Sequence, residues 1–207
     1  MANRLPQLVP FDQHNQFLES NVHPSDWINP TPASNYQLVI VGAGTAGWVT
    51  AAAAAGLGAR VALIERDLMG GDCLNVGCVP SKSLIAAARF VANGQRGKKM
   101  GFSGADNPSI NFSEIMERMR KQRSQISPVD SANRFKALGV DVFFGRASFV
   151  DDQTISIQTT NEPTTQLKFK KAVIASGARA KIPEIDGLDE VNFLTNETLF
   201  SITELPP

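Results

Sequence analysis

The feature that most constrains the fold is a glycine-rich turn set between an apolar strand and an alanine-rich helix. The turn reads Gly42-Ala43-Gly44-Thr45-Ala46-Gly47, which fits the pattern Gly-x-Gly-x-x-Gly. The apolar run 38–41 precedes it, the helical pattern 46–57 follows it, and a second strand is expected over 60–65. Parallel strands need such a crossover helix between them. The sequence therefore predicts an α/β fold with a parallel sheet.

Each part of this turn has a physical role in holding a dinucleotide. Gly42 permits the tight turn, Gly44 lets the backbone approach a pyrophosphate, and Gly47 lets the helix pack closely. The helix N-terminus at Thr45-Ala46 offers unpaired N–H groups to phosphates. Glu65 lies 23 positions after Gly42, at the end of the second strand, where it can accept hydrogen bonds from a ribose. We therefore expect an adenine dinucleotide in a Rossmann-like domain; the alternative is a turn that serves only packing.

The rest of the chain divides into a polar extension and further α/β elements. Residues 1–35 are polar and proline-rich, which predicts an N-terminal extension without a core of its own, and residues 36–207 are expected to form the domain. Helical spacing predicts helices over 73–93 and over 112–139, the second broken at Pro128. Segments with strand character predict a small antiparallel β-meander over 141–144, 147–150, 154–158 and 166–169, and a buried strand over 171–175.

Composition excludes several classes of protein. The segment 38–59 is apolar enough to cross a bilayer, but five glycines interrupt the stretch 42–58, so a strand, turn and buried helix explain it better. A net charge of zero gives no support for a nucleic-acid partner. Two cysteines allow at most one disulfide, which is too few to hold a small secreted domain together, and no signal-peptide pattern opens the chain. We expect a cytoplasmic protein with neither a membrane nor a nucleic-acid partner.

Both cysteines lie in one segment, Gly70-Gly71-Asp72-Cys73-Leu74-Asn75-Val76-Gly77-Cys78-Val79-Pro80-Ser81-Lys82. A zinc site is a poor interpretation, because both histidines lie far away in the extension, and no metal site is expected. In a regular helix, residues five apart have Cα atoms about 8.6 Å apart, whereas a disulfide needs roughly 4.4–6.8 Å. A Cys73–Cys78 disulfide would therefore require an irregular first turn. A reversible redox pair and two unrelated buried thiols both remain open.

The segment 70–82 resembles the Gly-Gly-x-Cys-x-Asn-x-Gly-Cys-x-Pro-Ser-Lys motif of the class I pyridine nucleotide-disulfide oxidoreductases, and within this family it is most similar to mercuric-reductase-like members. The resemblance implies that the dinucleotide is FAD. It also implies that Cys78 lies against the flavin as the charge-transfer thiol and that Cys73 is the interchange thiol that meets the substrate. Lys82 would lie near flavin N5, where its charge favours a reduced flavin.

The resemblance implies further cofactor contacts. Ala147 follows Gly145-Arg146 in a segment that touches adenine, and Gly177 belongs to a second flavin-domain signature over 175–179. Arg66 follows the ribose-binding Glu65, and Gly71 and Asp72 precede the interchange thiol; all three are expected to contact the cofactor. Asp72 replaces the usual threonine, and because an ionised carboxylate cannot donate to a phosphate, we expect it to cap a helix that starts at Cys73.

For the complete enzyme, the resemblance implies NAD(P)H as co-substrate, a metal-ion or small-molecule substrate such as Hg(II) or a disulfide, and a homodimer. The C-terminal NAD(P) and dimerisation domains of such enzymes are expected to be absent from this chain, which should not turn over alone. The alternatives are an enzyme of the dihydrolipoamide dehydrogenase or glutathione reductase type, a non-catalytic dinucleotide-binding module, and an NAD-binding half of a dehydrogenase.

Overall fold

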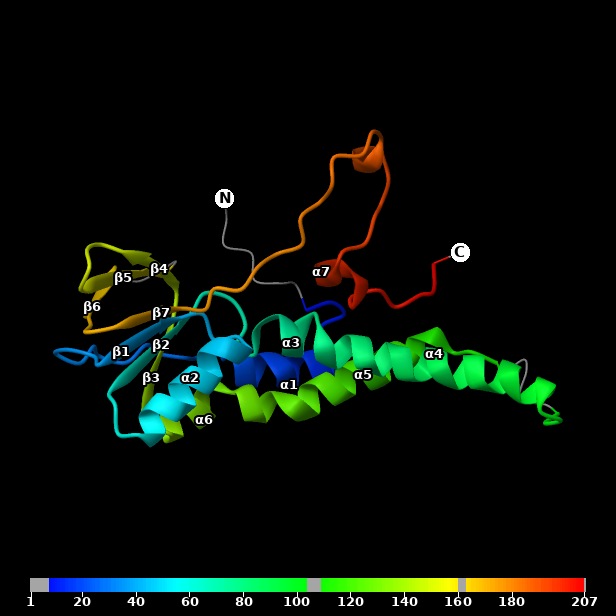
Figure 1. The fold of residues 1–207 in the computed structure, drawn as a ribbon, viewed down its shortest axis with the longest axis horizontal. Helices are drawn as coiled ribbons and strands as arrows, with labels where there is room; N and C mark the ends of the chain where they lie inside the picture. The colour runs from blue at the N-terminus through cyan, green and yellow to red at the C-terminus, as the bar shows by residue number, and fades with distance from the viewer. Residues whose placement is uncertain (1–7, 104–108, 160–162, 207) are drawn as a thin grey trace.

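The centre of the fold is a four-stranded parallel sheet. A computed structural model describes residues 8–103, 109–159 and 163–206. The strand order is β3-β2-β1-β7, and every neighbouring pair is parallel (Figure 1). The strands are β1 (Leu38–Val41), β2 (Val61–Glu65), β3 (Val140–Phe144) and β7 (Ala172–Ile174). The expected α/β fold with a parallel sheet is confirmed.

The glycine-rich turn connects β1 to α2 (Thr45–Gly56), and α2 returns to β2 beside β1. Both faces of β1, β2 and β3 are covered, so neighbouring residues of one strand face different layers. Ile40 and Leu63 pack into a cluster with the helices, whereas Val39 and Ile64 pack with the small antiparallel sheet. Burial on both faces explains why β1 and β2 read as continuous apolar runs and not as alternating ones. The edge strand β7 is not buried as expected, because Ile174 is exposed.

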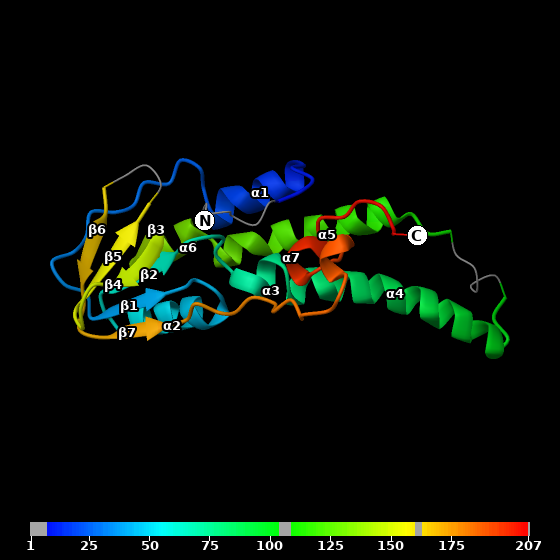
Figure 2. The same cartoon turned by 90° about the horizontal axis from the view of Figure 1, so that it is seen from above.

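Five helical segments lie among the described residues between β2 and β3. They are α3 (Gly71–Asn75), α4 (Cys78–Lys99), α5 (Phe112–Ile126), the 3-10 helix η1 (Ser127–Asp130) and α6 (Ala132–Ala137). The break expected at Pro128 is present, because η1 contains it. The single helix expected over 73–93 is wrong, because the chain bends at Val76 and Gly77 and separates α3 from α4. Helices α4 and α5 lie side by side and extend away from the sheet (Figure 2).

A second, antiparallel sheet has three strands, β4 (Arg146–Phe149), β5 (Thr154–Gln158) and β6 (Thr165–Lys168), in the order β4-β5-β6. The sequence analysis assigned 141–144 to this meander, which is wrong. That segment is β3, which pairs in parallel with β2 along its whole length. Four of its five residues are buried, so it needs the two-sided cover that only the central sheet provides.

The residues after β7 leave the sheet as a long exposed connection and then return to the helices (Figure 1). This connection contains the 3-10 helix η2 (Leu188–Glu190) and ends at α7 (Asn196–Leu199). Phe200, directly after α7, is buried in a small cluster with Val76, Met116 and Met119. The end of the described chain is therefore packed against α5 and the bend between α3 and α4.

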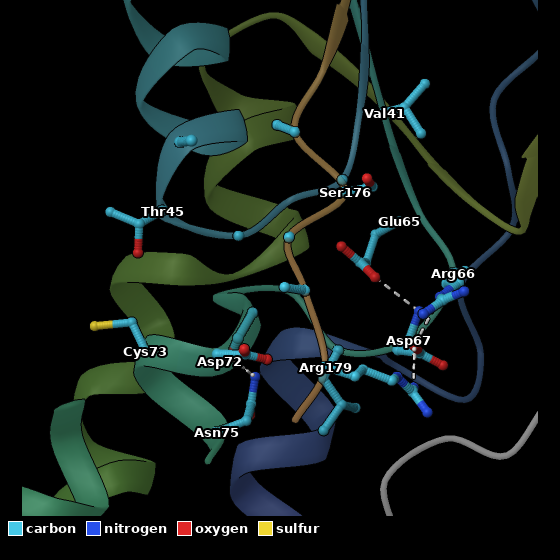
Figure 3. A pocket seen from close by; sticks show the side chains of 18 of the residues that line it. Val41, Thr45, Glu65, Arg66, Asp67, Asp72, Cys73, Asn75, Ser176 and Arg179 are labelled. Atoms are coloured by element: carbon cyan, nitrogen blue, oxygen red, sulfur yellow. Dashed lines mark hydrogen bonds and ion pairs between the residues drawn. The ribbon is translucent and has the colours of Figure 1, made fainter. Parts of the chain in front are cut away.

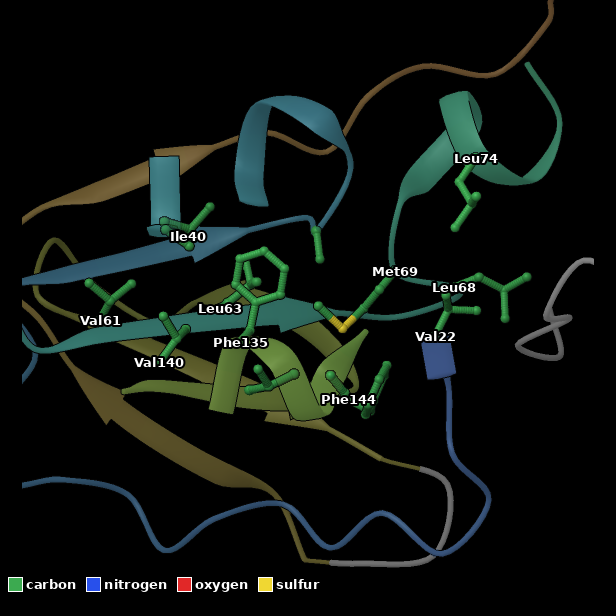
Figure 4. Close-up of a cluster of buried hydrophobic side chains, with 14 of the residues drawn as sticks. Val22, Ile40, Val61, Leu63, Leu68, Met69, Leu74, Phe135, Val140 and Phe144 are labelled. Carbon is green, nitrogen blue, oxygen red and sulfur yellow. The ribbon is translucent and has the colours of Figure 1, made fainter. Parts of the chain in front are cut away.

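The main core lies between the sheet and the helices, and the polar extension contributes to it (Figure 4). Helix α1 (Gln13–Val22) begins after Asp12, whose carboxylate accepts hydrogen bonds from two backbone N–H groups of the first turn. Leu18 and Val22 on this helix are fully buried. The sequence analysis missed α1, because a short, mostly polar helix shows its apolar face only against a partner. Within the described part of the chain, no helix is long and apolar enough to cross a membrane.

Candidate functional site

A cleft of about 870 Å³ opens at the carboxyl ends of β1, β2 and β7 (Figure 3). Its size is that of a site for a small molecule or cofactor. In open α/β sheets, ligands bind outside the carboxyl ends of the strands. The lining includes twelve residues expected to act in binding or catalysis: Gly42, Gly44, Thr45, Ala46, Glu65, Arg66, Gly71, Asp72, Cys73, Cys78, Ala147 and Gly177.

The glycine-rich turn forms the floor of this cleft through very close backbone packing. Gly42 has a φ of +101°, and a Cβ placed there would lie 2.3 Å from the carbonyl oxygen of Ala175. A Cβ on Gly47 would lie 1.8 Å from the carbonyl oxygen of Gly42, so the first turn of α2 packs directly on the turn. Gly47 does not line the cleft, which agrees with the packing role expected for it.

A second pair of glycines joins the turn to the cysteine segment. A Cβ on Gly71 would lie 2.7 Å from the Cα of Gly44, and the Gly70 N–H donates to the Ala43 carbonyl at 2.9 Å. This backbone contact sets the first turn of α2 beside the first turn of α3. The Thr45 hydroxyl consequently lies within hydrogen-bonding reach of the Cys73 sulfur, as the labelled side chains in Figure 3 indicate.

Glu65 ends β2 with its carboxylate directed at the turn. One carboxylate oxygen accepts from the Ala43 N–H at 2.7 Å and the other from the Asp67 N–H at 2.8 Å. Burial raises the pKa of Glu65, although these backbone donors act in the opposite direction. Each oxygen keeps a lone pair for a further donor such as a ribose hydroxyl.

Cys73 and Cys78 meet at the wall of the cleft. Cys73 belongs to α3 and Cys78 begins α4, and the bend at Val76 and Gly77 brings the two thiols into contact. The hydrogen bond between the Cys73 thiol and Cys78 is the main cause that raises the pKa of Cys73, and burial acts in the same direction. The irregular turn that a Cys73–Cys78 disulfide would require is therefore present.

The helix cap expected at Asp72 is wrong, whereas the place expected for Lys82 near the flavin stays a prediction. Asp72 does not cap a helix that starts at Cys73, because α3 begins at Gly71 and its N-cap is Gly70 in the left-handed conformation. Asp72 lies instead inside the first turn, where an acidic side chain is favourable to the helix dipole. Lys82 lies exposed on α4 and is not among the residues that line the cleft.

Four charged residues lie at the mouth of the cleft, and the sequence analysis expected only Arg66 among them to contact the cofactor. Arg179, on the connection after β7, contacts Asp67 at 3.4 Å and Glu197 at 3.5 Å, and Arg66 contacts Asp67 at 3.0 Å. All four line the cleft. Asp67 lies two positions after Glu65, and Arg179 is the last residue of the signature over 175–179, so each had a weak signal in the sequence. Glu197 comes from α7 and had none.

The residues present fit the dinucleotide that the sequence predicts. Among the described residues, a Cβ on Gly44 would meet only the Gly71 Cα, at 3.7 Å, so the Gly44 backbone is open to the cleft. The α2 N-terminus faces the cleft, and the Glu65 carboxylate can accept from a ribose hydroxyl. At the mouth, the positive charges of Arg66 and Arg179 are paired with the carboxylates of Asp67 and Glu197. The turn and Glu65 suit a diphosphate flanked by a nucleoside.

Comparison with known proteins gives consistent matches. The family described as "Pyridine nucleotide-disulphide oxidoreductase" matches residues 36–205. A mercuric reductase of Staphylococcus aureus is 33% identical over 172 residues, which is 83% of this chain and 30% of that protein. A dihydrolipoyl dehydrogenase of Bacillus subtilis (strain 168) is 34% identical over 169 residues, which is 81% of this chain and 35% of that protein.

Among solved structures, a Cu(II) complex of the HOCl-induced flavoprotein disulfide reductase RclA from Escherichia coli matches with a TM-score of 0.63 and 25% identity. The match covers 84% of this chain and 36% of that one. The chain thus spans about a third of the length of these relatives.

Proposed function

The chain belongs to the pyridine nucleotide-disulphide oxidoreductase family, and from this membership we propose that residues 36–207 are the FAD-binding domain of an NAD(P)H-dependent disulfide or Hg(II) oxidoreductase of the mercuric-reductase type. Cys73 and Cys78 are its redox-active pair. The match covers only 30% and 35% of the two relatives, so turnover with NAD(P)H, the homodimer and the substrate belong to the whole enzyme in this proposal.

One observation carries the proposal: the two thiols contact each other on the wall of the cleft that begins at the dinucleotide turn. Two unrelated buried cysteines would not need a bent helix that brings their sulfur atoms together. The contact between Gly44 and Gly71 joins the turn to the cysteine segment through the backbone, so cofactor and thiols share one rigid support.

The residues of this chain have separate tasks in the proposed reaction. FAD, when bound, supplies two-electron reduction chemistry next to the pair. Two electrons and two protons convert the Cys73–Cys78 disulfide into two thiols. The raised pKa of Cys73 keeps its proton on sulfur while it donates to Cys78. The hydrogen bond with Thr45 acts in the opposite direction and favours the Cys73 thiolate once that proton has been lost.

The test is anaerobic reduction of the chain reconstituted with FAD. We expect stoichiometric FAD binding and, on chemical reduction, a long-wavelength charge-transfer band that Cys78→Ser abolishes. Cys73→Ser is the matched control, because it removes the partner thiol and leaves Cys78 in place, and it should keep the band. Tight FAD binding without the band would instead favour a non-catalytic dinucleotide-binding module. Preference for NADH over FAD would favour an NAD-binding half of a dehydrogenase.

A second candidate reaction has support of the same strength. The dihydrolipoyl dehydrogenase of B. subtilis matches with 34% identity, close to the 33% of the mercuric reductase. We therefore keep a dihydrolipoamide or glutathione disulfide as the alternative substrate. Full-length enzyme assayed with Hg(II) and with oxidised lipoamide separates the two, because the ratio of kcat/KM values names the preferred substrate.

A further inference from the structure

The segment before residue 36 lies outside the family match, yet it supports the segment that carries the cysteine pair. We call residues 67–78 the redox turn. Helix α1 packs alongside α5, next to this turn (Figure 2). At the start of the redox turn, the Met69 N–H donates to the Val22 carbonyl at 3.0 Å, and His23 Nδ1 donates to the Asp67 carbonyl. The N-terminal extension therefore fixes the entrance of the redox turn through its backbone.

The middle of the redox turn is held from α5. Arg123 Nη1 donates to the backbone carbonyl of Asn75 at 2.7 Å. Asn75 lies between the two cysteines, at the last residue of α3, where backbone carbonyls lack partners within the helix. A charged donor at this carbonyl fixes the point at which α3 stops and the chain bends toward Cys78.

Helix α1 in turn holds Arg123. Asn15 is fully buried, and its Oδ1 accepts from Arg123 Nη2 at 2.6 Å. Asn15 Nδ2 donates to the Pro10 carbonyl at 2.7 Å, which fixes the amide so that its oxygen faces the guanidinium. The guanidinium thus forms a bridge from α1 to Asn75 with one nitrogen on each side.

Arg123 has little freedom to move from this position. Its side chain is 3% exposed, and its Nε has no hydrogen-bond partner among the described residues. Burial, together with the charge of Arg120, lowers the pKa of Arg123 to about 10, which still leaves it charged at neutral pH. Loss of one acceptor would leave a buried cation without a partner and destabilise the folded protein. Displacement of the Asn75 carbonyl away from Arg123 is therefore costly.

We propose that Arg123 and Asn15 are positioning residues for the Cys73–Cys78 pair, and that α1 therefore helps to set the geometry of the redox site. Neither residue lines the cleft; they act through the Asn75 carbonyl. The inference rests on the proposed redox function of the pair. It assigns to the N-terminal extension a role in setting how readily the two sulfur atoms form their bond.

The measurement is the thiol–disulfide equilibrium of the full chain in a dithiothreitol redox buffer, with and without FAD. Oxidised dithiothreitol accepts two electrons and two protons from Cys73 and Cys78, the S–S bond of the buffer breaks, and the protein S–S bond forms. The chain contains two cysteines, so trapping of free thiols followed by mass measurement reports on this pair alone.

Loosening the bend lowers the effective concentration of one thiol at the other, which disfavours the disulfide. For Arg123→Met we expect the equilibrium constant for disulfide formation to fall about tenfold, which is a rise of about 30 mV in reduction potential. Asn15→Leu, which removes the acceptor from Arg123, should lower the constant about threefold. Asn15→Asp keeps an acceptor for the guanidinium and should restore the constant to within about twofold of the wild type.

Asp12→Asn is the matched control for weaker docking of α1. It removes the charge that contacts Arg120 at 2.6 Å but keeps a residue suited to cap α1, and it leaves the bridge to Asn75 intact. We expect its equilibrium constant to stay within about twofold of the wild type. If Arg123→Met does not fold, Arg123→Lys carries the test, because lysine keeps the charge without the fork that reaches both acceptors.

Two results would overturn the inference. One is an unchanged equilibrium in the Arg123 and Asn15→Leu variants, which would make the bridge purely structural. The other is an equal shift in Asp12→Asn, which would trace the effect to general loss of stability. Failure of the proposed function is separate and visible in the wild type alone, as absence of the disulfide in every buffer or of the charge-transfer band with FAD.

Discussion

The close contact of Gly42 with the end of β7 predicts a large effect for the single substitution Gly42→Ala. The added methyl group would lie 2.3 Å from the Ala175 carbonyl oxygen and 2.8 Å from the carbonyl carbon. Both are backbone atoms, so relief requires movement of the strand end itself. That end is held to β1 by the hydrogen bond from the Ala175 N–H to the Val41 carbonyl at 2.8 Å.

The magnitude follows from three contributions. A residue with a Cβ at positive φ costs roughly 1–2 kcal/mol, and Gly42 has a φ of +101°. Overpacking that shifts backbone costs roughly 1–3 kcal/mol, and loss of the hydrogen bond to Val41 costs about 1 kcal/mol. Together they lower the free energy of unfolding by about 3–6 kcal/mol, or the Tm by roughly 6–24 °C for a chain of this size.

Two other glycines are matched controls for these contributions. Gly58 has a φ of +82° with no atom within 4 Å of an added Cβ, so Gly58→Ala should cost only the roughly 1–2 kcal/mol of backbone strain. Gly56 lies at the end of α2 without positive φ and with open space, so Gly56→Ala should be neutral or stabilising by up to about 1 kcal/mol.

Thermal and urea unfolding of the three variants without cofactor separates the cost of positive φ from the cost of the close contact with Ala175. From most to least stable, the expected order is Gly56→Ala, Gly58→Ala and Gly42→Ala. FAD affinity should fall in Gly42→Ala alone, because Ala175 lines the cleft. A Gly42→Ala variant as stable as Gly58→Ala, with normal affinity for FAD, would refute the close packing between the turn and β7.

Two pH-dependent predictions follow from the pKa directions. Because hydrogen bonding with Cys78 raises the pKa of Cys73, Cys78→Ala should move the alkylation of Cys73 by iodoacetamide to lower pH; an unchanged pH profile would contradict the contact between Cys73 and Cys78. The second prediction concerns Asp12. Burial raises the pKa of Asp12, but hydrogen bonds from the Asn15 N–H and from Arg120 outweigh it, so the net pKa is lowered. The stabilisation by Asp12 is therefore complete above its ordinary pKa of 3.8 and lost as pH falls through the lowered value. Urea unfolding should show less acid sensitivity in Asp12→Asn, and equal sensitivity would argue against this ion pair.

Local patterns determined most of the fold and of the candidate site. The glycines at 42, 44 and 47 specify a backbone that few other residues allow, so the turn and its neighbouring elements could be predicted from the sequence. The spacing of the cysteine segment predicted that a bonded pair would need an irregular turn, and the bend between α3 and α4 is that turn. Both conclusions depend on residues that are close in sequence.

Sequence analysis gave wrong assignments where a distant strand or the backbone conformation of a glycine decided the structure. The apolar segment of β3 is compatible with either sheet, and only its parallel pairing with β2 decides between them. Asp72 was expected to be the N-cap of a helix, but Gly70, in a left-handed conformation, is the N-cap and α3 begins at Gly71. The long-range partner, or the backbone angle of a neighbouring glycine, outweighed local preference in each case.

The role of the N-terminal extension was beyond sequence analysis for the same reason. In the sequence, Leu18 is one of a few apolar residues in a mostly polar segment, and only the fold shows that it is buried in the core. Asn15 is an ordinary polar residue in the sequence, and only the fold shows its hydrogen bond with Arg123, 108 positions later. A motif records which groups lie near one another along the chain. Burial and long-range hydrogen bonds form only when the chain folds. The tertiary structure alone therefore decided that α1 supports, through Arg123, the bend between Cys73 and Cys78.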